Sequence, residues 1–362
     1  MEEKTRRDFL KTAALGAAAI SASSAFPTEG QTQEKKKTVA IDMHSHMAVP
    51  EAVAMLPEKP SAISSPMSAA SAAHQQRLVE TLKDQLENPQ RRIADMDKAG
   101  IGMTILSMAP AQMFYKLEGS LAIDVARKQN EVIAATVQKY PKRFLGMATV
   151  PLQNPEASAA ELERAVRELK MKGVQIASNV TGQYLGEPKF LPFFEKAAAL
   201  DVPIFIHPTN VAAADRTKFF YFNNLIGNPL DTTITAGQLI FSGIFDRYPN
   251  LKIVLAHAGG MLPWNIDRWG HGWKVRPECQ EFIKKSPVEY MKKFYYDTIS
   301  HGPATLRFLI SRVGVDRVVM ATDYPYDMGD LDPLKSIKAA KLTAQERDKI
   351  VSKNAMALYK IA

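Results

Sequence analysis

Residues 41–46 read Ile-Asp-Met-His-Ser-His, so that two histidines directly follow a predicted strand. Side chains two positions apart on a strand point to the same side, so His44 and His46 can converge on one ion. By itself the pair is unspecific, since a buried histidine commonly only satisfies a neighbouring polar group. Whether the two histidines form part of a metal site depends on which residues stand at the ends of the other strands.

Strand-like and helix-like segments alternate from residue 38 onwards. Short apolar or β-branched runs predict strands at Val39–Met43, Met103–Ser107, Phe144–Val150, Val174–Ala177, Pro203–Ile206, Lys252–Ala256, Phe294–Ile299 and Val318–Thr322. Helical spacing lies between them, for example at Pro89–Ala99, Leu121–Lys139, Pro155–Met171, Pro188–Leu200, Thr232–Tyr248, Ala304–Val313 and Ala344–Tyr359. Such alternation predicts a parallel sheet, and eight strands close a (β/α)8 TIM barrel. A doubly wound open sheet would alternate too, but no G-x-G-x-x-G motif follows the first strand.

Residues 49–88 do not fit this repeat, because they form a long stretch rich in Ser, Ala, Met and Pro directly after the first strand. Loops that follow barrel strands build the catalytic face. The stretch is therefore expected to be a lid-like insertion or a substrate loop, with an insertion of no functional role as the alternative.

Further polar residues follow three other predicted strands. His207 follows the fifth strand, His257 the sixth and Asp323 the eighth, and in a barrel these carboxyl ends face one cavity. Imidazole and carboxylate groups suit Zn²⁺, Mn²⁺ or Fe²⁺ better than Ca²⁺. The only cysteine, Cys279, excludes a disulfide within the chain and any Cys₂ or Cys₄ metal site. The strand ends together predict a metal site built from histidine and aspartate.

The sequence resembles the amidohydrolase superfamily, and within it the branch typified by aminocarboxymuconate-semialdehyde decarboxylase. That branch also holds resorcylate and carboxyvanillate decarboxylases and some hydratases and hydrolases. The resemblance runs from Val39 to Tyr359, through the stretches IDMHSH, RRIADMDKAGI, RFLGMATVPLQNPEA, GVQIASN, VPIFIHP, FSGIFDRYPNLKIVLAHAGG and ATDYP. It implies that residues 38–362 form a single α/β domain, a (β/α)8 TIM barrel of the metal-dependent hydrolase type.

The resemblance also implies roles for individual residues. It makes His44, His46, His207 and Asp323 the metal ligands, and His257 the general acid/base. Asp323 can in addition handle a proton. One divalent ion is expected, with Zn²⁺ favoured and Mn²⁺ or Fe²⁺ as alternatives, because the end of the fourth strand, Ile176-Ala177-Ser178-Asn179, lacks the lysine that bridges two metals in other members.

For the substrate, the resemblance implies an arginine after the sixth strand, often supplied across a dimer interface. Arg268 stands at that place and would favour a small anionic organic substrate through a two-pronged contact with its carboxylate. A surface ion pair is the alternative role for Arg268. Other candidates for substrate binding lie at or just past strand ends: Asn179, Thr209, Trp264 and His301. A homodimer is expected.

Three functions remain compatible with this site. The first is a metal-dependent carboxy-lyase, a non-oxidative decarboxylase of a small aromatic or unsaturated carboxylic acid. The second is a hydrolase of a small cyclic ester, amide or related carbonyl compound. The third, a non-catalytic metal-binding protein, is disfavoured because His257 is not needed merely to hold the ion. Release of CO₂, or of an acid without CO₂, separates the first two.

The first 25 residues are typical of an export signal. Thr5-Arg6-Arg7-Asp8-Phe9-Leu10-Lys11 resembles the twin-arginine consensus, the weakly apolar run 12–22 follows, and Ser23-Ser24-Ala25 offers a cleavage site. That run is far shorter than the roughly 20 residues of a membrane span, so stable membrane insertion is not expected. We expect export to the periplasm of the bacterial cell envelope by the twin-arginine translocation machinery, with residues 26–37 as a flexible lead-in.

The charge balance argues against a nucleic-acid partner. The chain has 46 Lys and Arg against 38 Asp and Glu, a net charge of +8, and its densest basic run, Lys35-Lys36-Lys37, lies in the lead-in. A nucleic-acid binder concentrates its charge in a patch or stripe. In this chain Lys and Arg are spread along the sequence, and their excess positive charge could favour anionic substrates.

Overall fold

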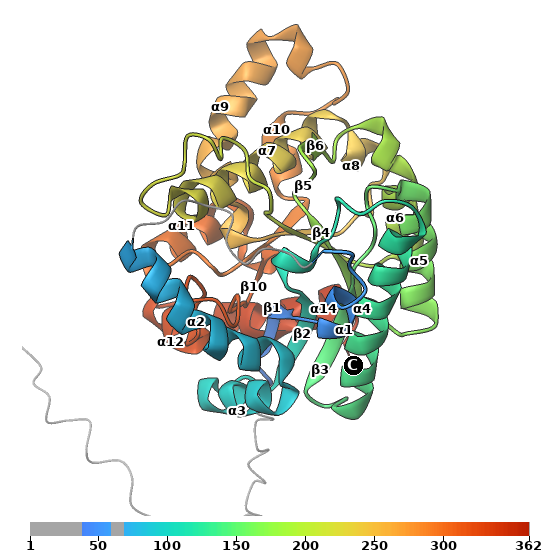
Figure 1. The fold of residues 1–362 in the computed structure, drawn as a ribbon. Coiled ribbons are helices and arrows are strands. Elements are labelled where there is room, and N and C mark those ends of the chain that lie inside the picture. Colours follow the sequence, from blue (N-terminus) through green and yellow to red (C-terminus); the bar gives the residue numbers. More distant parts are fainter. Residues whose placement is uncertain (1–37, 59–68, 362) are drawn as a thin grey trace, which may run out of the picture. The chain divides into compact units, whose positions relative to one another are not determined.

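A computed structural model describes residues 38–58 and 69–361, and these form a (β/α)8 barrel (Figure 1). Eight parallel strands pair in the order β1 (Ile41–Met47), β2 (Met103–Met108), β3 (Phe144–Ala148), β4 (Gly173–Ala177), β7 (Ile204–His207), β8 (Ile253–Leu255), β9 (Phe294–Asp297) and β10 (Val318–Val319). The backbone N–H of Met43 donates to the carbonyl of Met320 at 3.1 Å, and that of His46 to the carbonyl of Tyr324 at 2.8 Å. These bonds join the last segment of the barrel to the first. The predicted export signal and lead-in lie outside the described residues.

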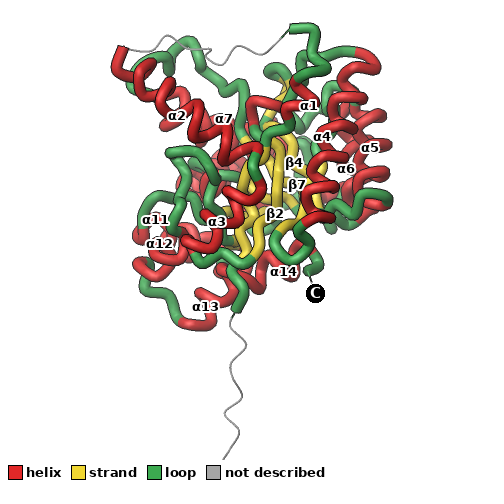
Figure 2. Tube along the Cα trace, turned by 60° about the horizontal axis from the view of Figure 1, so that its bottom comes forward, coloured by secondary structure: helices red, strands yellow, loops and turns green. Residues whose placement is uncertain are grey.

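Helices surround the strands (Figure 2). They are α1 (Pro50–Val53), α2 (Ala69–Glu87), α3 (Pro89–Ala99), α4 (Gly119–Lys139), α5 (Pro155–Arg167), α6 (Leu191–Leu200), α7 (Asn228–Phe241), α8 (Ile244–Arg247), α9 (Leu262–Val275), α10 (Pro287–Met291), α11 (Pro303–Val313), α12 (Pro333–Ala339), α13 (Ala344–Asp348) and α14 (Asn354–Tyr359). A hairpin of β5 (Asn179–Val180) and β6 (Gln183–Tyr184) follows β4. None of the helices within the described ranges has both the length and the apolar character needed to cross a membrane.

Local chemistry accounts for the predicted helix boundaries. α3 begins after Asn88, whose side chain accepts hydrogen bonds from the backbone N–H groups of the first turn, and it ends at Gly100, where φ is +71°. The helix predicted over residues 232–248 is instead interrupted. Gly243 has φ of +73° between α7 and α8, and a Cβ there would lie 2.4 Å from the carbonyl oxygen of Phe282. Only glycine fits this break.

The first strand differs from its predicted bounds in a way that shapes the site. The sequence predicts a strand that stops at Met43, whereas β1 continues through both histidines to Met47. Its pairing with β2 shifts register between Asp42 and Ser45, which is a bulge. A bulge adds one residue to a strand and re-aims the side chains beside it. The alternation of apolar and polar residues along the strand gives no sign of this bulge.

The predicted insertion contains α1 and α2, and residues 59–68 within it lie outside the described part. The backbone N–H of Ala48 donates to the carbonyl of Leu86 at 3.1 Å, which ties the end of α2 to the end of β1. Nε2 of His74, on α2, lies 3.2 Å from a carboxylate oxygen of Asp327 in the segment after β10. The inserted helix therefore contacts the carboxyl-terminal face of the barrel.

Candidate metal centre

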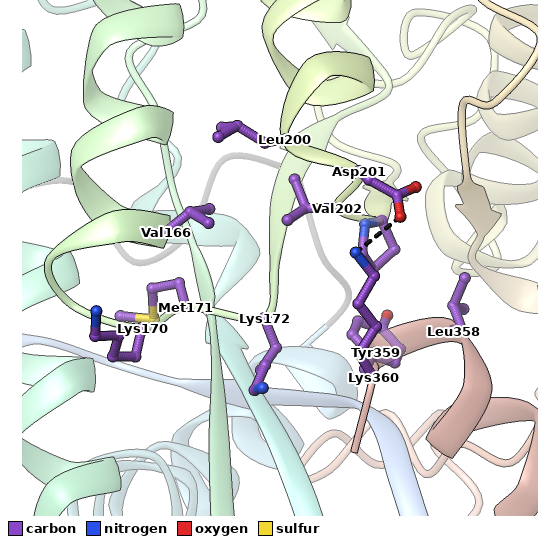
Figure 3. Close-up of a pocket in the computed structure, with 11 residues that line it drawn as sticks. Val166, Lys170, Met171, Lys172, Leu200, Asp201, Val202, Leu358, Tyr359 and Lys360 are labelled. Carbon is purple, nitrogen blue, oxygen red and sulfur yellow. Dashed lines mark ion pairs between the residues drawn. The ribbon is translucent and has the colours of Figure 1, made fainter. Parts of the chain in front are cut away.

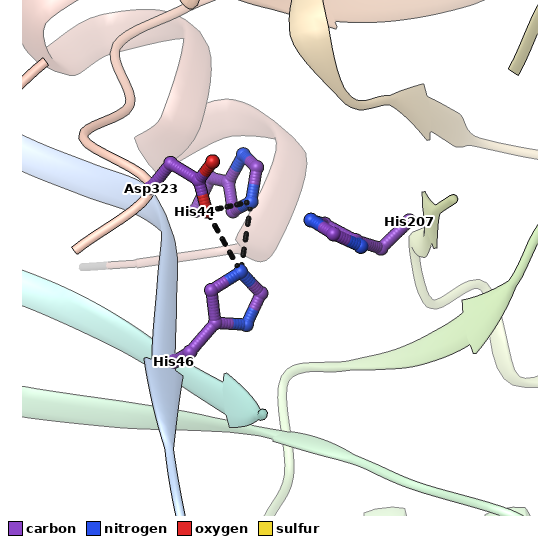
Figure 4. Close-up of side chains that lie close together, drawn as sticks. All are labelled: His44, His46, His207 and Asp323. Carbon is purple, nitrogen blue, oxygen red and sulfur yellow. Dashed lines mark hydrogen bonds and ion pairs between the residues drawn. The ribbon is translucent and has the colours of Figure 1, made fainter. Parts of the chain in front are cut away.

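Four side chains from three parts of the barrel meet at its carboxyl-terminal end (Figure 4). His44 and His46 come from β1, His207 from the last position of β7, and Asp323 from the segment after β10. One ligand atom from each lies within 4.8 Å of those of the others, and all four residues are buried. Three imidazoles and one carboxylate at this spacing can coordinate a single divalent ion.

The orientation of the histidines matches that of metal ligands. Nδ1 of His44 lies 2.8 Å from a carboxylate oxygen of Asp297, and Nδ1 of His46 lies 3.1 Å from the carbonyl oxygen of Met108. Nδ1 of His207 lies 3.0 Å from the carbonyl oxygen of Pro208. With Nδ1 held by an acceptor, each ring carries its proton there and presents Nε2 as the donor atom.

One buried atom of the cluster is left available for an ion. Nε2 of His207 is buried and has no hydrogen-bond partner among the described residues. A buried polar atom left without a partner costs about 1–3 kcal/mol. A divalent ion held by the four side chains would satisfy this atom, so the residues present fit a metal ion.

The protonation states favour the same conclusion. Burial lowers the pKa of His46, and burial with the neighbouring histidines lowers that of His207 well below its usual range. Burial acts against the charge of Asp323, but the histidines around it hold the pKa of this carboxyl well below the ordinary value. Burial also opposes protonation of His44, yet Asp323 and Asp297 outweigh it and raise its pKa to about 10. Two ligands are thus already neutral and one is ionised, as metal binding requires.

His257 lies beside the cluster without being part of it. Its Nε2 is 3.4 Å from the second carboxylate oxygen of Asp323, and its side chain is 15% exposed. His257 and Ala258 have φ angles of +54° and +55°, and they follow β8 in a short turn. The ring therefore stands at the edge of the centre, where it can meet both solvent and a bound molecule.

A buried arginine that the sequence analysis does not single out holds the bulged strand. The guanidinium of Arg92, on α3, donates hydrogen bonds to Oγ of Ser45 and to the carbonyl oxygen of His46. It also lies 4.6 Å from the ring centre of Tyr324. Burial lowers the pKa of Arg92 to about 10, which leaves it charged at neutral pH. Its contacts fix the backbone on either side of His46.

Tyr326 is a second residue missing from the sequence analysis. Its ring centre lies 5.4 Å from that of His46. Burial and the nearby charge of Asp323 raise the pKa of Tyr326, so the phenol stays protonated. Tyr326 lies only three residues after Asp323 in the sequence. An aromatic residue in a loop, however, has no spacing that marks it as part of a site.

Within the described chain, no hydrogen bond or ion pair joins the substrate-binding candidates to the four clustered side chains. Arg268 and Trp264 lie on α9, which projects at the top of Figure 1, and both are exposed. His301 is also exposed, just after β9. Asn179 is buried and donates to the carbonyl oxygen of Thr209 at 2.8 Å. These two residues thus hold the loops after β4 and β7 together.

Two cavities in the described part of the chain lie away from the four clustered side chains. One of about 210 Å³ lies at the amino ends of β4 and β7, where Lys360 pairs with Asp201 at 2.7 Å beside Lys170 and Lys172 (Figure 3). Another of about 330 Å³ lies outside β1 and is lined by Arg92 among others. Neither contains the four clustered side chains, so the convergence of donor atoms identifies the candidate site.

Comparison with known proteins identifies the family to which the chain belongs. The family model described as "Amidohydrolase" matches residues 41–361, nearly the whole described barrel. The chain belongs to the amidohydrolase family. This match confirms the resemblance and, with the eight parallel strands, the predicted barrel.

Among the relatives of this amidohydrolase is the 2-amino-3-carboxymuconate-6-semialdehyde decarboxylase of Dictyostelium discoideum, 36% identical over 72% of this chain and 73% of that protein. The crystal structure of 5-carboxyvanillate decarboxylase from Sphingomonas paucimobilis is similar with a TM-score of 0.80 and 26% identity, over 90% of this chain and 100% of the other. A dihydroxybenzoic acid decarboxylase from Polaromonas sp. JS666, solved with manganese and the inhibitor 2-nitroresorcinol, gives a TM-score of 0.78 and 28% identity, over 90% and 97%.

Proposed function

We propose that this amidohydrolase is a metal-dependent, non-oxidative decarboxylase of a small aromatic or unsaturated carboxylic acid. The observation that carries the proposal is the cluster of three Nε2 atoms and one carboxylate, with the unpartnered Nε2 of His207 inside it and His257 at its edge. Three similar proteins, one by sequence and two by structure, are decarboxylases of such acids, which supports this activity over hydrolysis.

In this proposal His44, His46, His207 and Asp323 hold one divalent ion. A bound ion would act as a Lewis acid towards substrate oxygens. Nitrogen-rich sites of this kind accept Zn²⁺, Mn²⁺ or Fe²⁺. Zn²⁺ is the expectation from the sequence, and the manganese in the Polaromonas relative makes Mn²⁺ an equal candidate. Metal content of the purified protein and reconstitution with each ion separate these choices.

His257 supplies the proton in the chemical step. The bond between the ring or alkene carbon and the carboxylate breaks, CO₂ leaves, and the electron pair stays on the carbon. Nε2–H of His257 donates the proton that forms the new C–H bond, which is the role of a positioned general acid. Before the transfer, Asp323 accepts a hydrogen bond from this same Nε2–H at 3.4 Å and so keeps the protonated ring oriented.

We also propose that the protein is a homodimer in which Arg268 reaches the site of the other subunit and binds the substrate carboxylate. Arg268 is exposed and has no acidic partner in the described part of the chain, and Trp264 one turn earlier is 76% exposed. Two-pronged guanidinium–carboxylate contacts are strong and directional. Sedimentation of the protein and the KM of Arg268→Lys test this: a monomer with wild-type KM would contradict the dimeric site.

The function is tested with purified protein reconstituted with Mn²⁺ or Zn²⁺. Dihydroxybenzoic, carboxyvanillic and dienoic acids are supplied, and ultraviolet absorbance and CO₂ are followed together. Decarboxylation predicts CO₂ equal to substrate consumed. Release of an acid from esters or amides without CO₂ would favour a hydrolase, and metal binding without any turnover would favour a non-catalytic protein.

We further propose export by the twin-arginine route, with cleavage near Ala25 and residence in the periplasm. The support is the run from Thr5 to Lys11 with its pair of arginines. Replacing Arg6 and Arg7 by lysine keeps the charge and should retain the precursor inside the cell. Continued export of that variant would point to the general secretory route.

A further inference from the structure

The carboxylate of Asp297 connects the metal cluster with the turn that carries His257. Asp297 is the last residue of β9, is fully buried, and accepts four hydrogen bonds. One oxygen faces Nδ1 of His44 at 2.8 Å and the backbone N–H of His257 at 2.9 Å. The other accepts from the backbone N–H groups of Ala258 at 2.8 Å and Ile299 at 3.1 Å.

On the metal side, Asp297 determines which nitrogen of His44 faces the cluster. With Nδ1–H donated to the carboxylate, Nε2 lies 3.0 Å from Nε2 of His46 and 3.1 Å from a carboxylate oxygen of Asp323. The corresponding Nδ1 atoms meet uncharged partners: that of His207 meets a backbone carbonyl, and that of His46 meets a backbone carbonyl and, at 3.5 Å, Oγ of Ser107. His44 is therefore the ligand of this cluster whose donor strength depends on a charged partner, and such partners raise the basicity of the ring.

On the acid/base side, Asp297 stabilises an unfavourable backbone. His257 and Ala258 both have positive φ angles, and each costs roughly 1–2 kcal/mol for a residue other than glycine. Their two backbone N–H groups donate to the two oxygens of Asp297. The His257 ring has one polar contact among the described residues, Asp323, at the long distance of 3.4 Å. Its position therefore depends chiefly on the turn.

We propose that Asp297 is a positioning residue that sets the metal-binding tautomer of His44 and, through the same carboxylate, the place of His257. This inference rests on the proposed function only for the role of His257. It gives a role to a buried carboxylate that pairs with no Lys or Arg among the described residues: a neutral group of the same shape cannot accept all four bonds. Asp297 itself need not touch a substrate.

The test variant is Asp297→Asn in the full chain. Whichever way the introduced amide turns, two of the four donors lose their acceptor, and His44 loses the adjacent negative charge in both orientations. We expect the affinity for Mn²⁺, titrated through the electron paramagnetic resonance signal of the free ion, to fall by about 10–100-fold. At saturating Mn²⁺ we expect kcat to fall by about 10²-fold through misplacement of His257, with little change in KM.

The control is Glu161→Gln, which neutralises another buried carboxylate far from the centre. Glu161 lies on α5 and accepts hydrogen bonds from Asn130 at 2.7 Å and Arg164 at 2.8 Å. This variant should lower the melting temperature but leave Mn²⁺ affinity and kcat unchanged. If Asp297→Asn behaves in the same way, or changes only one of the two properties, the joint role of Asp297 is overturned.

A second substitution separates the two roles. Ala258→Gly, added to Asp297→Asn, lets the turn adopt its positive φ without strain. It should recover part of kcat and leave Mn²⁺ affinity at the reduced value. No recovery of kcat, or recovery of Mn²⁺ affinity as well, would contradict the assignment of the two effects to His257 and His44.

A measurement on the unaltered chain keeps the proposal testable if Asp297→Asn does not fold. Nitrogen-15 labelling of histidine in the Zn²⁺-loaded protein reports which ring nitrogen of His44 carries the proton, identified by the signal lost in His44→Gln. We expect an Nδ1–H in a strong hydrogen bond. A proton on Nε2 would refute the role of Asp297 without bearing on decarboxylation, whereas an Mn²⁺-binding protein without turnover would refute only the proposed function.

Discussion

Replacing His257 by asparagine isolates the proton donor from the metal. The site is suited to this change because His257 has φ of +54°, a conformation that asparagine adopts more readily than most residues. The ring is not among the four clustered ligands and meets them only through Asp323 at 3.4 Å. His257→Asn should therefore fold and bind one metal ion per chain as before.

The expected loss is large because the variant removes the one histidine of the described site that borders the cluster without belonging to the ligand set. Removing a positioned general acid typically costs about 10²–10⁴ in rate. At about 1.36 kcal/mol per tenfold change, this raises the barrier by about 2.7–5.4 kcal/mol. The effect should fall on kcat, since His257→Asn leaves unchanged the four side chains that would hold the ion and Arg268, the residue proposed to bind the substrate carboxylate.

The assay is steady-state CO₂ release from an accepted acid by Mn²⁺-loaded protein, with metal content measured on the same samples. His271→Asn is the matched control, because His271 is an exposed histidine on α9. The control should keep the wild-type kcat. Near-normal turnover by His257→Asn with full metal occupancy would remove His257 from the mechanism, and loss of the metal would mean that it acts as a ligand.

Three further outcomes are expected. Asp323→Ala should lose the metal, since it removes the cluster's only carboxylate; elemental analysis that finds full occupancy would refute the ligand set. Affinity for Mn²⁺ should weaken as pH falls, because Asp323 and Asp297 raise the pKa of His44 and the ion must displace its proton; a pH-independent Kd across the neutral range would contradict this. Gly260→Ala should cost more than about 1 kcal/mol of stability in chemical denaturation, because φ is +63° and a Cβ would lie 2.2 Å from the carbonyl oxygen of Pro229; an unchanged unfolding midpoint would show that the backbone relaxes there.

The sequence is sufficient to predict the barrel and the metal cluster because both depend on regular spacing. Short apolar strands alternate with helices, and parallel strands bring their carboxyl ends to one face whatever the details of the loops. His207 and Asp323 therefore meet His44 and His46 although they are far apart in the chain. Resemblance to a family adds roles, but the meeting itself follows from topology.

Features that depend on side-chain direction could not be predicted in this way. The bulge in β1 leaves no trace in the pattern of apolar residues. Asp297 ends β9 and His301 follows it by four residues, and only the folded structure distinguishes the buried carboxylate beside His44 from the exposed histidine. Arg92 reads as one more charged residue of an amphipathic helix, although its guanidinium is buried against β1.

The ligands of the metal centre come from both ends of the folding chain. His46 and Asp323 are 277 positions apart, and their ligand atoms lie 3.0 Å from each other only because the last segment of the barrel docks on the first. Closing a loop of this length costs chain entropy, and the contact between these two residues offsets part of that cost. The contact also cannot form on a growing or truncated chain that lacks residue 323. If the four side chains hold an ion as proposed, metal uptake follows the docking of the last segment on the first, and a bound ion would report that the barrel has closed.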